Sequence, residues 1–89
     1  MMYPLMTLND GTEIVHSELL PDNSVKVVIE TPIRGGFKNM TVYLPSYEIE
    51  SVNGYSQREV NKFMKFIRSA AHLIIRFAKG GGFEHAPVI

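Results

Sequence analysis

Seven basic side chains recur at helical spacing in the second half of the chain, and such side chains bind phosphate or carboxylate groups. At about 100° per residue they fall within roughly 120° of one another on a helical wheel. The set comprises Arg58, Lys62, Lys65, Arg68, His72, Arg76 and Lys79. A helix over these residues would present one cationic face, so the spacing predicts binding of an anionic partner.

The opposite side of the same helix is apolar, and residues 56–79 contain a single carboxylate, Glu59. Exposed helices usually mix charges of both signs, because opposite charges four residues apart stabilise them. The shortage of acid favours a functional surface, whereas Lys and Arg are also common on helices that are merely solvated. The sequence leaves both interpretations open. It also leaves open whether the partner is phosphate backbone or an acidic protein surface, including the acidic first half of a second copy.

The charge of the chain is divided between its two halves. Residues 1–55 carry three Lys or Arg and seven Asp or Glu, whereas residues 56–89 carry six and two, so net charges of −4 and +4 cancel. A neutral protein lacks the general affinity of a basic protein for nucleic acid. Any nucleic-acid binding must therefore be local, through the helix.

Two glycine clusters, each between a cation and a phenylalanine, give a second candidate surface. They are Arg34-Gly35-Gly36-Phe37 and Lys79-Gly80-Gly81-Gly82-Phe83. The cation could meet a phosphate while the ring stacks on a base, which is how proteins bind single-stranded nucleic acid. The structural alternative, which we favour, is a hairpin loop at the first cluster and a left-handed helix cap at Gly80.

One pair of residues in the sequence could support catalysis. His16 and Glu18 would share a face of a strand, where they could act as a general base or as half of a metal site. Two ligands do not make a metal site, and on an exposed antiparallel face the pair is better explained as cross-strand partners of Lys26 and Glu30. We therefore expect no catalytic residue, no metal and no cofactor.

Turn signals divide the first half of the chain into four short strands, at 3–8, 13–20, 25–31 and 37–44. Asn9-Asp10-Gly11 predicts the first hairpin, and Pro32 and Pro45 should end the third and fourth strands because proline has no N–H to donate. The residues expected on the inner faces of the last two strands are Val25, Val27, Ile29, Thr31, Met40, Val42 and Leu44.

A connector over 45–55, with a short extended piece at 47–52, leads to a helix over 57–79. Ser56 and Glu59 have the spacing of a capping box at its start, and Gly80 suits its end. Residues 80–89 form a tail. The prediction is an α+β domain, in which a four-stranded antiparallel sheet (β-β-β-β-α) packs one face against a long C-terminal amphipathic helix.

Length and composition are those of one domain, spanning 1–89. A chain this short buries only about 60–65% of its unfolded surface, and it has no cysteine. Self-association would add stability, so a homodimer is expected. Neither a signal peptide nor a membrane span is evident, so we expect a cytoplasmic protein that does not enter a membrane.

Three segments resemble parts of small uncharacterised proteins of bacterial mobile elements and phages. They are DGTEIVHS at 10–17, LPSYE at 44–48 and AHLIIRFA at 71–78. The resemblance implies an accessory protein that acts by binding, as antitoxins, anti-CRISPR inhibitors and transcription modulators do. The predicted element order is also similar to that of positive-cofactor transcriptional coactivators, which dimerise and bind single-stranded DNA. Those proteins carry basic and aromatic residues on their strands, where this chain has only the basic residues Lys26 and Lys38.

The leading hypothesis is a non-enzymatic binding or regulatory protein, an accessory factor of a mobile element or phage that occupies a partner as an inhibitor does. The alternative is a single-stranded DNA- or RNA-binding protein that uses the basic helix face with Arg34 and Phe37. An enzyme with a histidine-carboxylate site comes third.

Overall fold

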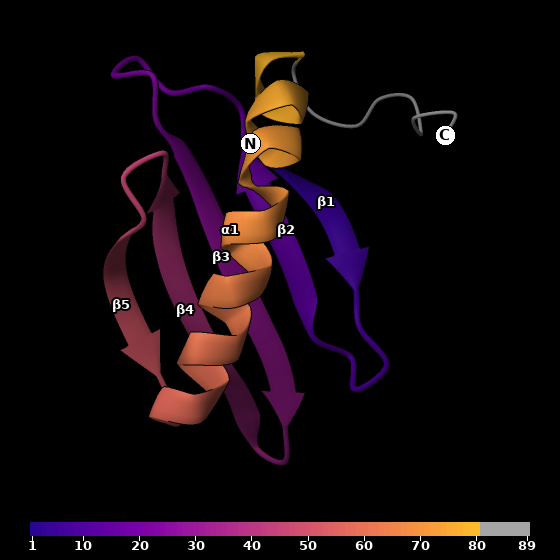
Figure 1. The fold of residues 1–89 in the computed structure, drawn as a ribbon. Coiled ribbons are helices and arrows are strands. Elements are labelled where there is room, and N and C mark those ends of the chain that lie inside the picture. Colours follow the sequence, from indigo (N-terminus) through magenta and orange to yellow (C-terminus); the bar gives the residue numbers. More distant parts are fainter. Residues whose placement is uncertain (81–89) are drawn as a thin grey trace.

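The computed structural model describes residues 1–80, which form an antiparallel sheet covered on one face by a helix (Figure 1). The strands lie side by side in chain order. The elements are β1 (Met2–Thr7), β2 (Glu13–Ser17), β3 (Val25–Ile33), β4 (Gly36–Leu44), β5 (Glu48–Asn53) and α1 (Gln57–Lys79). The α+β class, with an antiparallel sheet and one C-terminal helix, is confirmed. The prediction of four strands is wrong, because the sheet has five.

The additional strand, β5, lies in the predicted connector, where a short extended piece at 47–52 was expected but no sheet pairing. It pairs with β4, so that Ile49 lies opposite Val42 and Val52 lies opposite Met40. A register shift between these pairs leaves Glu50 without an opposite residue, which is the arrangement of a β-bulge. Because the bulge adds one residue, the two apolar residues that face the helix are three positions apart. The two-residue alternation that reveals a strand in a sequence is therefore broken here.

β2 ends at Ser17, three residues before the predicted end. The Ser17 hydroxyl oxygen accepts a hydrogen bond from the N–H of Lys26 (2.9 Å), where a strand would offer a carbonyl. Two residues later, Leu19 donates its N–H to the carbonyl of Ala78 in α1 (3.3 Å). The chain thus leaves the sheet at this point and contacts the end of the helix.

β3 continues to Ile33, through the proline that was expected to end it. Pro32 lies opposite Phe37 of β4. On its other side, the ladder with β2 reaches only to Glu30, opposite Glu13. Pro32 therefore lies where β3 has one neighbour instead of two, and proline is tolerated at such an edge.

The core lies between α1 and the sheet face that it covers, called here the inner face. The buried apolar strand residues are Ile14, Val25, Val27, Ile29, Met40, Val42 and Leu44, so the alternation predicted for the third and fourth strands is confirmed. Three hydroxyls cross the same layer: that of Thr31 lies 2.6 Å from that of Thr12 and 2.8 Å from that of Tyr55. These groups satisfy one another, which avoids the free-energy cost of leaving a buried hydroxyl unpaired.

α1 has the predicted bounds, and its capping box is confirmed. The Ser56 oxygen accepts from the Glu59 N–H (3.2 Å), and the Ser56 N–H donates to the Glu59 carboxylate (2.9 Å). The buried helix residues are Val60, Met64, Ile67, Ala71, Ile74 and Ala78. The expected left-handed cap at Gly80 is wrong, because its φ is −84°. The Gly80 N–H instead donates to the carbonyls of Arg76 and Phe77, which tightens the last turn.

One helix is too narrow to cover five strands. Strands about 4.8 Å apart give a sheet roughly 19 Å wide, whereas a helix with its side chains measures about 10 Å across. Figure 1 shows α1 crossing the sheet from the β4–β5 side to the β2 side. Inward-facing residues of the edge strands remain partly exposed: Met6 by 37%, Ile49 by 39% and Val52 by 38%. Within residues 1–80, no helix is long and apolar enough to span a membrane.

Candidate binding surface

The seven predicted cationic residues all lie on the exposed side of α1, away from the sheet. We call this set the basic face: Arg58, Lys62, Lys65, Arg68, His72, Arg76 and Lys79, each of which is exposed. At about 1.5 Å per residue, the face extends roughly 31 Å along the helix axis. The structure therefore brings the helical candidates together on one continuous surface.

The only carboxylate of α1 is held on the sheet side. Glu59 lies with one oxygen 2.6 Å from Nζ of Lys38 in β4, while its other oxygen accepts from the Ser56 N–H. The hydrogen bond from Lys38 holds the pKa of the Glu59 carboxyl below its usual value and raises the pKa of Lys38. Among residues 1–80, no carboxylate lies within ion-pair distance of a basic-face cation. The positive charge of this face is therefore not neutralised within the described chain.

Tyr47, which the sequence did not single out, lies beside the basic face. It follows β4 in the loop to β5, and its ring centroid lies 5.4 Å from Cζ of Arg68. Its backbone has a φ of +62°, in the left-handed region that favours glycine. The quadrupole of an aromatic ring attracts a cation that lies over its face. Tyr47 and Arg68 thus form a cation–π pair near the middle of the basic face.

The other half of the predicted surface lies elsewhere. Arg34 is in the β3–β4 hairpin, and Phe37, which is 63% exposed, points to the outer face of the sheet, opposite to α1. There Phe37 borders a hollow that is also lined by Glu13 and Glu30. Phe37 thus lies near two carboxylates and is separated from the basic face by the sheet. The second glycine cluster ends at Phe83, outside the described residues.

His16 and Glu18 do not form an exposed pair. His16 is fully buried on the inner face, between the rings of Tyr3 and Phe77, with centroid distances of 5.9 and 6.5 Å. Its Nδ1 donates to the Ser17 carbonyl (2.9 Å). Glu18 follows the end of β2, and its carboxylate lies 3.4 Å from the N-terminal amino group. The pair therefore offers no accessible base.

The expected cross-strand partners of this pair are also wrong. His16 lies opposite Val27, and Glu30 lies opposite Glu13. The alternation of β2 explains this, because His16 shares a face with Ile14, and that face is the buried one. Among residues 1–80, no group of three or more His, Asp or Glu residues could hold a metal ion.

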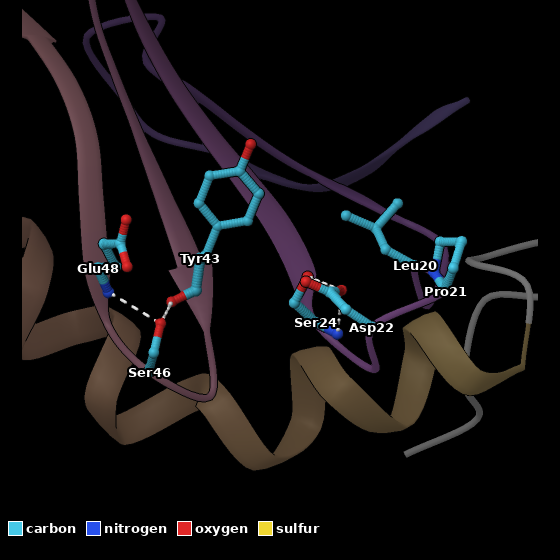
Figure 2. Close-up of a pocket in the computed structure, with 7 residues that line it drawn as sticks. All are labelled: Leu20, Pro21, Asp22, Ser24, Tyr43, Ser46 and Glu48. Atoms are coloured by element: carbon cyan, nitrogen blue, oxygen red, sulfur yellow. Dashed lines mark hydrogen bonds between the residues drawn. The ribbon is translucent and has the colours of Figure 1, made fainter.

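A hollow of about 530 Å³ lies where β3 begins and β4 ends. Figure 2 shows Tyr43 there, pointing away from α1. Its hydroxyl donates to Glu50 (3.0 Å), and this hydrogen bond raises the pKa of Tyr43. The Asp22 carboxylate accepts hydrogen bonds from the hydroxyl and the N–H of Ser24, and the hydrogen bond from the hydroxyl lowers the pKa of Asp22. The polar groups of this hollow are thus largely paired with one another, and its charge is acidic.

Exposed apolar side chains border the basic face. Leu73 lies at its edge and is 44% exposed, and Ile49 and Val52 flank the helix on β5.

Comparisons with family models, with curated proteins and with solved structures give no match to this chain. The resemblance to proteins of mobile elements and phages therefore stays a prediction, and the function must be inferred from the basic face and its surroundings.

Proposed function

We propose that this protein is a non-catalytic binding protein whose basic face occupies an acidic surface of a partner protein. The observation that carries the proposal is the separation of charge on α1. Its cations are exposed and have no ion-pair partner among the described residues, while its one carboxylate is bonded to Lys38 on the sheet side. Such a binder would act as the accessory factors of mobile elements and phages do, by blocking a partner's surface.

The apolar residues beside the cations favour a protein partner. A charge pair at a solvated surface contributes only about 0.2–1 kcal/mol, so charge alone steers and orients a complex more than it holds it together. Affinity in protein interfaces comes mainly from buried apolar and aromatic anchors. Leu73, Ile49 and Val52 are exposed large apolar residues placed to serve as such anchors.

Single-stranded nucleic acid is the second candidate, and Tyr47 favours it. Proteins of that class combine cations that follow the phosphates with rings on which bases stack. Tyr47 beside Arg68 supplies one such combination on the correct side of the sheet. Phe37, the ring predicted for this role, is on the opposite side.

Fluorescence anisotropy with labelled probes tests the proposal. One probe is an amphipathic peptide with Glu and Leu on one helical side, the second is a peptide of the same composition in scrambled order, and the third is a short single-stranded oligonucleotide. We expect the amphipathic peptide to bind more tightly than the other two. Lys65→Glu combined with Arg76→Glu should weaken its binding about tenfold or more, and Leu73→Ser should weaken it without changing its dependence on salt.

The matched control is Lys26→Glu combined with Arg34→Glu, which makes the same change of net charge away from the basic face. It should leave binding of the amphipathic peptide almost unchanged at a protein concentration low enough that the protein is monomeric. Equal affinity for ordered and scrambled peptides, or an equal loss in the control, would overturn the proposal. Tighter binding of the oligonucleotide, lost on Tyr47→Ala and falling steeply between about 50 and 200 mM salt, would establish the second candidate instead.

A further inference from the structure

The outer face of the sheet, which α1 does not cover, carries the opposite charge to the basic face. Its carboxylates follow from the strand register, because Glu13 and Glu30 lie opposite each other and Glu48 lies opposite Tyr43. Glu50 joins them through its hydrogen bond with Tyr43. We call Glu13, Glu30, Glu48 and Glu50 the acidic face. The same face carries one cation, Lys26, opposite Tyr43, and the four carboxylates outnumber it. The molecule is thus a two-layer slab, basic on the helix side and acidic on the sheet side.

The acidic face contains like charges that the described chain does not neutralise. Glu13 and Glu30 are both exposed and directly cross-strand, an arrangement that destabilises a sheet through repulsion. Within residues 1–80, neither they nor Glu48 has a cation at ion-pair distance. A cationic surface laid against this face would relieve the repulsion.

The distance between charged groups is similar on the acidic face and on the basic face. Glu30 and Lys26 are four residues apart on β3, about 13 Å at 3.3 Å per residue. Glu48 lies level with Lys26 but two strands away, about 10 Å across the sheet. The acidic face therefore has two groups of carboxylates, Glu13 with Glu30 and Glu48 with Glu50, and Glu30 and Glu48 are roughly 16 Å apart. On α1, Lys65 and Arg76 are eleven residues apart, also about 16 Å.

Apolar residues lie beside the charges on both faces. On the sheet, Val15 and Val28 lie opposite each other in the centre of the outer face and are half-buried. They are placed along the strands between the two acidic groups. On the helix, Leu73 lies at the border of the basic face, to one side of Lys65 and Arg76, and is 44% exposed. Each face thus has an apolar side chain beside its charges, and the charges have opposite signs on the two faces.

We propose that the acidic face of one copy of this chain docks on the basic face of a second copy, head to tail. The proposal rests on the proposed function in that it uses the same basic face, and it names a second copy as one occupant of that face. The two surfaces in contact differ, so the contact is heterologous and leaves one free face at each end. Assembly is therefore open-ended, in place of the homodimer that chain length suggested. Self-association would also compete with any other partner of the basic face.

Sedimentation velocity on wild type and two variants, each with one face removed, tests this contact. The first variant, Lys65→Glu with Arg76→Glu, keeps the acidic face. The second, Glu13→Gln with Glu30→Gln and Glu48→Gln, keeps the basic face. We expect wild type to form species of increasing size as its concentration rises at low salt, and these species should dissociate on adding salt. Each variant alone should be a monomer.

Mixing the two variants is the decisive step. Each retains the surface that the other lacks, so the mixture should form a one-to-one dimer and nothing larger. The substituted residues are all exposed, and far-UV circular dichroism with a thermal melt checks that both variants fold. A monomeric wild type at low salt overturns the proposal. So does association of either variant alone to the extent of wild type, since the contact would then lie elsewhere.

Different results would overturn the proposed function and the head-to-tail contact. The Glu-to-Gln variant retains the basic face, so under the proposed function it binds the amphipathic peptide as wild type does or more tightly, because self-association no longer competes. Peptide binding with no self-association overturns only the head-to-tail contact. Self-association that follows the variants as described, without peptide binding, overturns only the proposed function.

Discussion

Nζ of Lys38 in β4 lies 2.6 Å from Oε2 of Glu59 in the first turn of α1. This ion pair joins the start of the helix to the sheet, and Lys38 also lies 5.2 Å from the ring centroid of Tyr55. It gives Glu59 two structural roles, as the helix cap and as the partner of Lys38. The acid of the helix is thereby kept away from the surface where the cations lie.

The ion pair should stabilise the fold in a pH-dependent manner. The pKa of Glu59 is lowered in the folded protein from an ordinary value of 4.5, chiefly by the hydrogen bond from Lys38. A lowered folded pKa gives stability that is fully present above the unfolded value and is lost as pH falls through the folded value. Glu59→Gln keeps the capping geometry and removes the charge. The thermal midpoint of wild type should exceed that of the variant at neutral pH, and the difference should shrink below pH 4.5. A difference that stays constant into acid would contradict this assignment.

Gly54, between β5 and α1, should not tolerate a side chain. Its φ is +90°, and a Cβ atom there would lie 2.8 Å from Cγ of Lys38. We expect Gly54→Ala to lower the free energy of unfolding by about 1–2 kcal/mol or more, because L-residues are strained in this conformation. Gly36→Ala is the matched control, since a Cβ atom there would meet nothing within 4 Å and no positive φ is required. Equal urea midpoints for the two variants would contradict the prediction.

The sequence predicts the helix and the central strands well because each signal there is local. Ser56 and Glu59 mark the start of the helix, and its apolar spacing sets the buried side. In the centre of the sheet, Val25, Val27 and Ile29 alternate without interruption, so the inner face can be identified. The exposed positions of the basic face follow from the same helical spacing, because burying one side of a helix exposes the other.

The parts that the sequence did not predict depend on long-range pairing. The sequence indicates only a short extended piece at 47–52, and its pairing with β4 as a fifth strand is concealed by the bulge at Glu50, which breaks the alternation. The burial of His16 depends on which face of β2 meets the helix. Ile14 and Val15 place one apolar residue on each face, so the sequence does not show which face is buried. The position of Tyr47 depends on its own left-handed backbone conformation in the loop and on the helix that passes beside it. Neither leaves a pattern in the sequence.

Ile67 should be essential for the packing of α1. It is fully buried in the middle of the helix, whereas Leu73, six residues further on, is 44% exposed. We expect Ile67→Ala to lower the free energy of unfolding by about 2–5 kcal/mol, from the lost apolar burial and the cavity left behind. Leu73→Ala should change it by less than about 0.5 kcal/mol. Urea denaturation followed by circular dichroism measures both. Similar losses for the two variants would mean that the helix packs on the sheet by a different face.

His16 and His72 should differ in chemical reactivity, because one imidazole is in the core and the other is on the basic face. His16 is fully buried, and its Nδ1 must carry the proton, since the Ser17 carbonyl can only accept. Its Nε2 has no hydrogen-bond partner in the part of the chain that the structure describes. Diethyl pyrocarbonate should therefore modify His72 rapidly in the folded protein and His16 only after unfolding in urea, as measured by peptide mass mapping. His16→Ala should lower the free energy of unfolding by about 2–4 kcal/mol, as truncation of a buried side chain does, whereas His72→Ala should have little effect. If His16 reacts in the folded protein as rapidly as His72, its ring is accessible and a histidine-carboxylate site has to be considered again.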